Sequence, residues 1–385
     1  MEAPMPPGAC RSIAQFEKLR KIGEGTYGSV FMARDRASAR LVALKRVKIR
    51  TSGFEREGMP TTALREIGLL RSLPAHENVV RLHEVAVGSR MDAIFLVFEY
   101  CEHDVARLLD WMRTPFSTSE VKCLMLQLFE AVAHLHEHHV IHRDLKLSNL
   151  LLTAGGVLKL CDFGLARPLA APASAAPQPL TAKVVTLWYR APELLLGERA
   201  YTSAIDDWAL GCILGELLLH RPLMPGASEP DQLRLMCELL GSPSERIWPG
   251  LGALPHARSV ALPTQPYNEL ETRFRGTREL SRGALALLNA LLTYDPRRRC
   301  GARAALGHAF FAEAPPAKAR ALLPTFPTLH NLADAPEPGK PAAGAANAAA
   351  VRGHKRPALG GAAAGGEGTG RAGAASGKSA RAGGS

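Results

Sequence analysis

Predicted strands lie almost entirely before residue 100 and long helices after it, and this separation constrains the fold more than any other feature of the sequence. Short apolar stretches predict strands at 16–19, 28–32, 41–45 and 94–98. Helical periodicity predicts helices at 60–73, 120–138 and 204–219. Because alternating βαβ units would mix both kinds of element along the whole chain, the separation favours an α+β fold in two lobes.

The composition is that of an ordinary globular chain. Of 385 residues, 46% are hydrophobic and 22% are charged, which excludes a coiled coil and a wholly disordered protein. The longest apolar run, 209–219, contains Glu216 and is shorter than the roughly 18 residues of a membrane span, so we expect no membrane contact. Seven cysteines without a Cys-x-x-Cys pair favour free thiols in a reducing compartment.

The net charge of +11 raises the alternative of a nucleic-acid binder. Residues 335–385 hold seven Lys or Arg against two acidic residues, or +5 of this charge, which leaves +6 for the rest of the chain. This basic tail is rich in Ala and Gly and poor in large apolar side chains, so we predict that it is disordered. Nucleic acid is therefore expected to bind at most weakly, through the tail, in a salt-sensitive way.

A glycine-rich run with the pattern G-x-G-x-x-G occupies residues 23–28. In a dinucleotide-binding fold the last glycine opens a helix, but here Ser29-Val30-Phe31 continues as a predicted strand. The run is therefore interpreted as a hairpin turn whose backbone N–H groups can approach phosphate oxygens. On this motif alone, a plain glycine-rich hairpin is an equal alternative.

Further polar groups follow in a fixed order. Lys45 stands in an apolar strand, where its ammonium needs anionic partners, and Glu66 on the next predicted helix could supply one. A His-Arg-Asp sequence then ends at Asp144, Asn149 follows on the same short loop, and Asp162 opens an Asp-Phe-Gly sequence after a short strand. Each tripeptide can occur by chance, but this combination of order and spacing is not expected by chance.

These residues resemble the motifs of the eukaryotic protein kinases, over residues 16–311. The segment Pro60-Thr61-Thr62-Ala63-Leu64-Arg65-Glu66 is similar to the cyclin-contacting signature of the cyclin-dependent kinases, and within them to the PITSLRE and PISSLRE branch, the tenth and eleventh members. Residues 184–193, 147–149 and 323–327 have the same affiliation. Thr62 and Ala63 replace the residues that name the branch, so the choice among cyclins stays open.

The resemblance implies the bilobal protein-kinase fold, with a small antiparallel-sheet N-lobe that carries one main helix and a large helical C-lobe. It places the N-lobe at 16–98, the hinge at 99–104 and the C-lobe at 105–311. Residues 312–334 would form a C-terminal extension packed on the core, and residues 1–15 a disordered N-terminus. Two structural pairings are also implied: Arg299 with Glu193, and Asp206 with the catalytic loop.

The resemblance further implies an ATP-dependent serine/threonine kinase that uses Mg²⁺. The catalytic residues would be Asp144, which accepts or orients the substrate hydroxyl proton, Lys146 near the γ-phosphate, and Asn149. Asn149 and Asp162 would hold Mg²⁺. The expected ATP-binding residues are Ile22, Gly23, Glu24, Gly25, Thr26, Tyr27, Gly28, Val30, Ala43, Lys45, Glu66, Phe98 as the gatekeeper, Glu99, Cys101 and Asp104.

Regulation by phosphorylation is implied as well. Thr181 matches an activating phosphorylation site, and the arginines that would receive its phosphate are Arg65, Arg143 and Arg167. Thr26 and Tyr27 match inhibitory phosphorylation sites, with the equal alternative that they are loop residues that are never modified.

The expected partners are a cyclin-type regulatory subunit, bound through the helix Pro60–Glu66, and protein substrates with Ser-Pro or Thr-Pro. Family analogy favours the nucleus, the cytoplasm or both, and a role in cell-cycle or in transcription and RNA-processing control. The rival from another class is a pseudokinase scaffold without catalysis. Against it stand the intact residues Lys45, Glu66, Asp144, Asn149 and Asp162.

Overall fold

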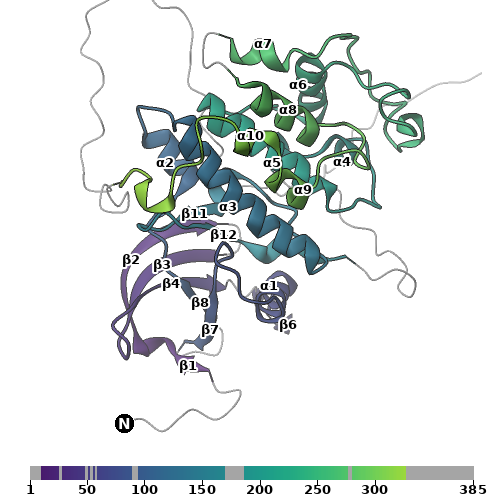
Figure 1. The fold of residues 1–385 in the computed structure, drawn as a ribbon. Helices are drawn as coiled ribbons and strands as arrows, with labels where there is room; N and C mark the ends of the chain where they lie inside the picture. The colour runs from purple at the N-terminus through teal and green to yellow at the C-terminus, as the bar shows by residue number, and fades with distance from the viewer. Residues whose placement is uncertain are drawn as a thin grey trace, which may run out of the picture.

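The structure, a computed structural model, describes residues 10–25, 28–47, 51–52, 55–56, 59–88, 94–169, 186–275 and 280–326. The predictions for residues 1–9, Thr26, Tyr27, Thr181 and everything from residue 327 onward lie outside these ranges. Figure 1 shows the main sheet and α1 at one end of the molecule and most of the helices at the other, which confirms the predicted two-lobed α+β fold.

The N-lobe contains a six-stranded sheet with the strand order β1-β7-β8-β4-β3-β2. Its strands are β1 (Arg11–Ser12), β2 (Phe16–Gly25), β3 (Gly28–Asp35), β4 (Leu41–Val47), β7 (Leu82–Val87) and β8 (Ile94–Glu99). Strand β1 pairs parallel with β7, and all other neighbours pair antiparallel. A separate hairpin joins β5 (Thr51–Ser52) and β6 (Glu55–Arg56). The four strands expected from apolar stretches are thus confirmed.

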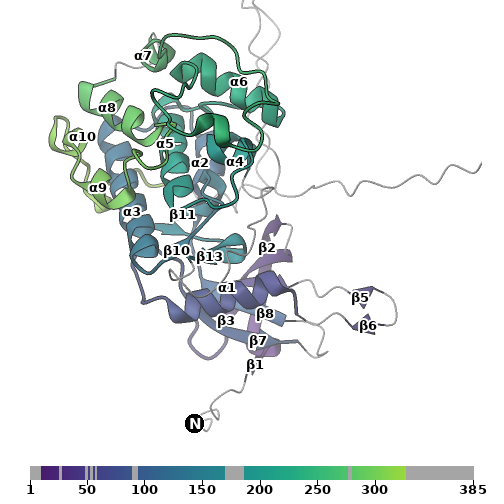
Figure 2. The same ribbon diagram turned by 90° about the vertical axis from the view of Figure 1, so that its right-hand side faces the viewer.

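Helix α1 (Thr61–Ser72) is the main helix of the N-lobe. Its buried side chains are Ala63, Glu66 and Leu69, which recur at the spacing of one helix face. Figure 2 shows α1 running alongside the sheet, on the side of the C-lobe. Leu64 points the other way and is 54% exposed, so α1 keeps an apolar residue at the surface.

The C-lobe is built around two long helices. Ser117 and Glu120 form a reciprocal capping box that starts α3, and every residue of α5 is buried. The helices are α2 (Val105–Trp111), α3 (Thr118–Glu137), α4 (Pro192–Leu195), α5 (Ala204–Leu219), α6 (Glu229–Leu240), α7 (Leu270–Phe274), α8 (Arg282–Leu291), α9 (Ala302–Leu306) and α10 (Ala309–Ala312). No helix among the described residues is long and apolar enough to cross a membrane.

Short elements complete the fold. The strands of the C-lobe side are β9 (His103–Asp104), β10 (Val140–Ile141), β11 (Leu150–Leu152), β12 (Leu158–Leu160) and β13 (Arg167–Pro168). The 3-10 helices are η1 (Ile13–Gln15), η2 (Leu147–Asn149), η3 (Phe163–Leu165), η4 (Leu187–Tyr189), η5 (Leu251–Ala253) and η6 (Arg320–Leu322). Strand β11 pairs with both β9 and β12, which brings the hinge beside the segments that carry the polar motifs.

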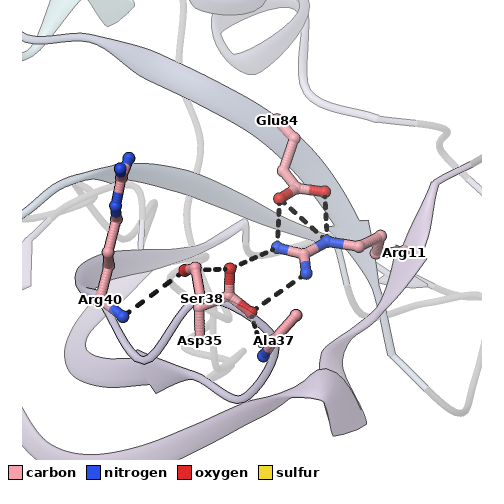
Figure 3. Close-up of polar contacts among 6 residues, drawn as sticks. All are labelled: Arg11, Asp35, Ala37, Ser38, Arg40 and Glu84. Atoms are coloured by element: carbon pink, nitrogen blue, oxygen red, sulfur yellow. Dashed lines mark hydrogen bonds and ion pairs between the residues drawn. The ribbon is translucent and has the colours of Figure 1, made fainter. Parts of the chain in front are cut away.

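The N-terminal segment corrects one prediction. We expected disorder through residue 15, but residues 11–15 form β1 and η1. The guanidinium of Arg11 donates hydrogen bonds to Asp35 at 3.1 and 3.2 Å and to Glu84 at 2.5 to 3.1 Å, as Figure 3 shows. It also lies over the ring of Phe16, 4.5 Å from the centroid. Two carboxylates and one ring thus order a segment that has little apolar surface of its own.

Replacing Arg11 by alanine is expected to destabilise the protein by about 1.5–3 kcal/mol, because hydrogen bonds to partly buried charged groups contribute this much. Asp35 and Glu84 would be left side by side without their shared cation. Thermal unfolding measures the change. The matched control is Arg34→Ala, whose ion pair with Glu17 is 3.9 Å long and about half exposed, so that its loss should cost under about 1 kcal/mol. Equal effects of the two substitutions would contradict the prediction.

Candidate active site

Three charged side chains from three elements meet between the lobes. Nζ of Lys45, on β4, donates hydrogen bonds to both carboxylate oxygens of Glu66, at 2.8 and 2.9 Å, and to Oδ1 of Asp162, at 3.1 Å. Glu66 projects from α1, and Asp162 directly precedes η3. The lysine in an apolar strand therefore has the anionic partners that its burial requires.

Burial opposes the charge on each member of this triad, with different outcomes. The pKa of Lys45 is raised, because attraction to Asp162 and Glu66 outweighs burial. Burial also disfavours the charge on Asp162, but attraction to Lys45 outweighs it and lowers the pKa of that carboxyl. Burial prevails at Glu66 and raises its pKa. Lys45 and Asp162 therefore stay charged at neutral pH, as contact with phosphate and metal requires.

Asp144, Lys146 and Asn149 form a second cluster on the loop after β10. Oδ2 of Asp144 accepts hydrogen bonds from Nζ of Lys146 at 2.8 Å and from Nδ2 of Asn149 at 3.0 Å. Nδ2 of Asn149 also donates to the backbone carbonyl of Asp144, at 2.7 Å. Within the described ranges, neither Oδ1 of Asp144 nor the amide oxygen of Asn149 has a hydrogen-bond partner. One acceptor oxygen on each side chain is therefore available to a ligand.

These residues fit a divalent metal. The carboxylate of Asp162 and the amide oxygen of Asn149 are hard oxygen donors of the kind that Mg²⁺ prefers. The side chain of Asp162 forms an ion pair with Lys45 and is still 25% exposed, so a bound ion can reach its carboxylate. Asp162 has φ 67°, in the left-handed region that a non-glycine residue occupies at a cost, as does Arg143 with φ 65°.

Asp206, on α5, anchors the backbone of the loop that carries Asp144. Its carboxylate accepts hydrogen bonds from the backbone N–H groups of His142 at 2.8 Å and Arg143 at 2.9 Å, and lies 3.0 Å from Nε2 of His136. Asp206 is buried, yet these donors outweigh burial and lower its pKa. The predicted anchoring role is thus confirmed: two bonds to this carboxylate hold the loop backbone in place, and the third contact joins it to α3.

The glycine-rich run is a hairpin, as predicted from the strand that follows it. Gly23 pairs with Val30, and Gly25 with Gly28, across β2 and β3. A methyl group on Gly28 would lie 1.8 Å from the carbonyl oxygen of Arg46, so only glycine allows this approach to β4. Ile22 and Glu24 lie on β2, which places the described residues of the expected phosphate-binding turn on two adjacent strands.

The residues that we expect at an adenine site lie on β4, on β8 and in the segment that follows β8. Ala43 on β4 pairs with the buried Phe98 on β8. The carboxylate of Glu99 is engaged on the far side, by Nζ of Lys159 at 2.9 Å and by the backbone N–H of Arg81 at 2.7 Å. The backbone N–H of Glu99 also donates to the carbonyl of Arg81, at 3.0 Å, so both the side chain and the N–H of Glu99 are bonded within the protein.

The C-terminal end of the hinge leads into α2. Cys101 is buried, and burial raises its pKa to about 12, so its thiol is neutral. Oδ1 of Asp104 accepts from the backbone N–H groups of Ala106 at 2.8 Å and Arg107 at 3.2 Å and so caps α2. Arg107 also donates to the carbonyl of Ile22, at 3.3 Å. Sequence reasoning missed this contact between the lobes, because nothing local signals a pair 85 residues apart.

Two of the three expected phosphate-receiving arginines lie on neighbouring segments. Arg167 on β13 pairs with Ile141 on β10, just before Arg143. Arg143 is buried and donates to the carbonyl of Leu165 at 2.7 Å and to the hydroxyl of Tyr201 at 2.6 Å, a partner that the sequence did not indicate. Nε of Arg167 is buried without a hydrogen-bond partner in the described part of the chain. Arg65 lies on α1, in the other lobe.

Comparison with known proteins agrees with this geometry. The sequence model of the protein kinase domain matches residues 16–311. Cyclin-dependent kinase 10 of Mus musculus is 51% identical over 329 residues, which cover 86% of this chain and 88% of that protein. Probable cyclin-dependent kinase 10 of Dictyostelium discoideum is 50% identical over 320 residues, 83% and 85% of the two chains. Cyclin-dependent kinase G-2 of Oryza sativa subsp. indica is 51% identical over 84% of this chain and 45% of its own length.

The family match covers both lobes and includes all residues of the Lys45–Glu66–Asp162 triad and of the Asp144–Lys146–Asn149 cluster. The resemblance to the branch of the tenth and eleventh cyclin-dependent kinases is confirmed by relatives that carry the name cyclin-dependent kinase 10. The chain therefore belongs to the protein kinase family, as an ATP-dependent serine/threonine kinase of the cyclin-dependent type.

Proposed function

We propose that this kinase transfers the γ-phosphoryl group of Mg-ATP to serine or threonine hydroxyls that precede proline, under the control of a cyclin. The observation that carries the proposal is the formed Lys45–Glu66–Asp162 triad next to an Asp144 carboxylate with one oxygen available. A scaffold without catalysis would not need the triad and the Asp144 carboxylate to be held in this hydrogen-bonded arrangement.

Each side chain has a distinct part in the transfer. Lys45, held by Glu66, would bind the α- and β-phosphates, and Lys146 would approach the γ-phosphate from beside Asp144. Oδ1 of Asp144 would accept or orient the proton of the attacking hydroxyl. Asp162 and Asn149 would hold Mg²⁺, which when bound neutralises charge on the phosphate oxygens. Because the transition state is loose, positioning and charge neutralisation account for most of the catalysis.

The nucleotide base would lie between the sheet and the hinge. Gly23, Val30 and Ala43 would line it from β2, β3 and β4, with Phe98 behind it. The backbone groups of Glu99 and Cys101 would bond to adenine, and Asp104 would reach the ribose. Phe98 is buried, so its ring serves the core and the pocket wall together.

A cyclin would bind at α1, through Pro60–Glu66. Leu64 offers an exposed apolar side chain there, and Gly68 faces open space, since a methyl group on it would meet no atom within 4 Å. Contact at α1 would act on catalysis directly, because Glu66 on the same helix holds Lys45. The relatives that are named cyclin-dependent kinases support this assignment.

Selection of proline after the phosphoacceptor would come from the segment around η4. Trp188 donates from its ring N–H to the carbonyl of Gly226 at 3.0 Å, and Arg190 pairs with Glu229 at 2.5 Å. These contacts fasten the segment to the loop before α6 and to α6 itself. By family analogy we place the enzyme in the nucleus, the cytoplasm or both, in control of the cell cycle or of transcription and RNA processing.

The test is phosphate transfer from labelled Mg-ATP by the full chain, purified from eukaryotic cells with its copurified cyclin. We expect transfer to a Ser-Pro protein substrate and at least about tenfold less to the matched Ser-Ala substrate, since one favourable pocket contact contributes about this factor. Equal transfer to both substrates would contradict the proposed preference for proline but not the kinase activity. If a cyclin is bound and neither substrate is phosphorylated, the scaffold becomes the better account.

A further inference from the structure

The chain beyond the matched kinase region does not leave the surface at once. Residues 313–326, which we call the strap, run from α10 toward the hinge, and Figure 1 shows this yellow-green segment passing beside α2. Nζ of the fully buried Lys122, on α3, donates to the backbone carbonyls of Glu313 and Pro315, each at 2.7 Å. Because the lysine bonds to main-chain atoms, it fixes the path of the strap rather than one side chain.

The strap then touches both lobes. Lys318 pairs with Glu120 on α3 at 2.8 Å, and Arg320 pairs at 2.5 Å with Glu77, in the loop between α1 and β7. A methyl group on Gly156 would lie 2.3 Å from the carbonyl oxygen of Arg320, so the turn between β11 and β12 admits the strap only because it carries a glycine. The predicted packing of the C-terminal extension on the core is thus seen for its described residues.

The last described residue of the strap packs against the hinge. The ring of Phe326 meets His103 edge to face, with centroids 5.8 Å apart, and meets Phe116 in the same way at 6.2 Å. His103 is 3% exposed, and its Nδ1 has no hydrogen-bond partner among the residues that the structure describes. The imidazole of His103 therefore packs against the ring of Phe326, which in turn packs against Phe116, while its Nδ1 makes no hydrogen bond with the described residues.

His103 and Asp104 are the two residues of β9, and Asp104 is the expected ribose contact. The carboxylate of Asp104 caps α2, and α2 in turn carries Arg107, which reaches the carbonyl of Ile22 on the phosphate-binding hairpin. Both residues of β9 pair with β11, Asp104 with Leu151 and His103 with Leu152, so Asp104 directly follows the residue whose side chain packs against Phe326.

We propose that Phe326 is a positioning residue for nucleotide binding, which acts through His103 on the place of the Asp104 carboxylate. The inference rests on the proposed nucleotide site. The ring of Phe326 meets His103, which directly precedes Asp104, so its effect would be transmitted along β9. Through this contact, the strap would contribute to nucleotide binding although it lies beyond the matched kinase region.

The test compares the dissociation constant of Mg-ADP for the full chain with its cyclin, as wild type and as Phe326→Ala. We expect the variant to bind Mg-ADP roughly three- to tenfold more weakly, the range that corresponds to the loss of one aromatic contact. The KM for ATP should rise by the same factor while kcat stays unchanged, because Asp144 and Lys45 are not disturbed. Phe326→Tyr, which keeps the ring, should restore the affinity.

The matched control is Leu322→Ala, on the same strap, because its side chain is 68% exposed and should leave Mg-ADP binding unchanged. If Phe326→Ala lowers only the unfolding temperature and leaves both Mg-ADP affinity and KM at wild-type values, Phe326 is a packing residue and the inference is wrong. Should Phe326→Ala fail to fold, Phe326→Leu takes its place with the same two readouts. A wild-type protein that binds no Mg-ADP would overturn the nucleotide site as well.

Discussion

Replacing Asp144 by asparagine is expected to lower the rate of phosphoryl transfer by about 10²–10⁴-fold, the contribution of a positioned acid–base group. Asparagine has the shape of aspartate and can still accept hydrogen bonds from Lys146 and Asn149, so the loop should keep its conformation. It cannot take a proton from the substrate hydroxyl. The measurement is kcat for a Ser-Pro protein substrate at saturating Mg-ATP, with the cyclin bound.

Two observations separate this loss from a folding defect. The dissociation constant of Mg-ADP should stay at its wild-type value, because Asp144 is not among the residues that we assign to the nucleotide. The same change at Asp110, an exposed aspartate on α2, should leave kcat unaltered. If Asp144→Asn retains the wild-type rate, the assignment of Asp144 as the group that handles the proton is wrong.

Replacing Arg299 by methionine is expected to destabilise the C-lobe by about 3–5 kcal/mol, because it leaves a buried carboxylate without its partner. The guanidinium of Arg299 is fully buried and donates to both oxygens of Glu193, at 2.8 and 2.9 Å, which confirms the pair expected from the sequence. It also donates to the backbone carbonyls of Thr293, Ala204 and Tyr294. All these acceptors lose their donor together.

Thermal or urea unfolding measures this effect, and Arg303→Met is the matched control. Arg303 pairs with Glu137 at 2.5 Å, but its side chain is 64% exposed, so its loss should cost under about 1 kcal/mol. Replacing Glu193 as well, in the double variant Arg299→Met with Glu193→Leu, should recover part of the loss, since no buried charge is then left unpaired. A single variant no less stable than Arg303→Met would contradict the prediction.

Much of the site could be predicted before the structure, because the motifs are local. The turn at 23–28, the loop from His142 to Asn149 and the start of η3 each occupy a few consecutive residues, and their order along the chain carries the information. What the sequence could not supply is how these pieces meet. The 2.8 Å contact of Lys45 with Glu66 depends on where α1 packs. The oxygens left available on Asp144 and Asn149 depend on which of their atoms are already bonded.

The sequence by itself determined the elements and the chemistry. Helix α5 runs over Ala204–Leu219 as its apolar pattern predicts, because a mostly apolar segment of this length can be buried on all sides. Only the tertiary structure decided the two terminal segments. Arg11 is ordered by acids 24 and 73 residues away, and Phe326 by rings more than 200 residues away, so no local pattern marks either. Contacts between distant residues become visible only when the chain has folded, since folding alone brings their partners within bonding distance.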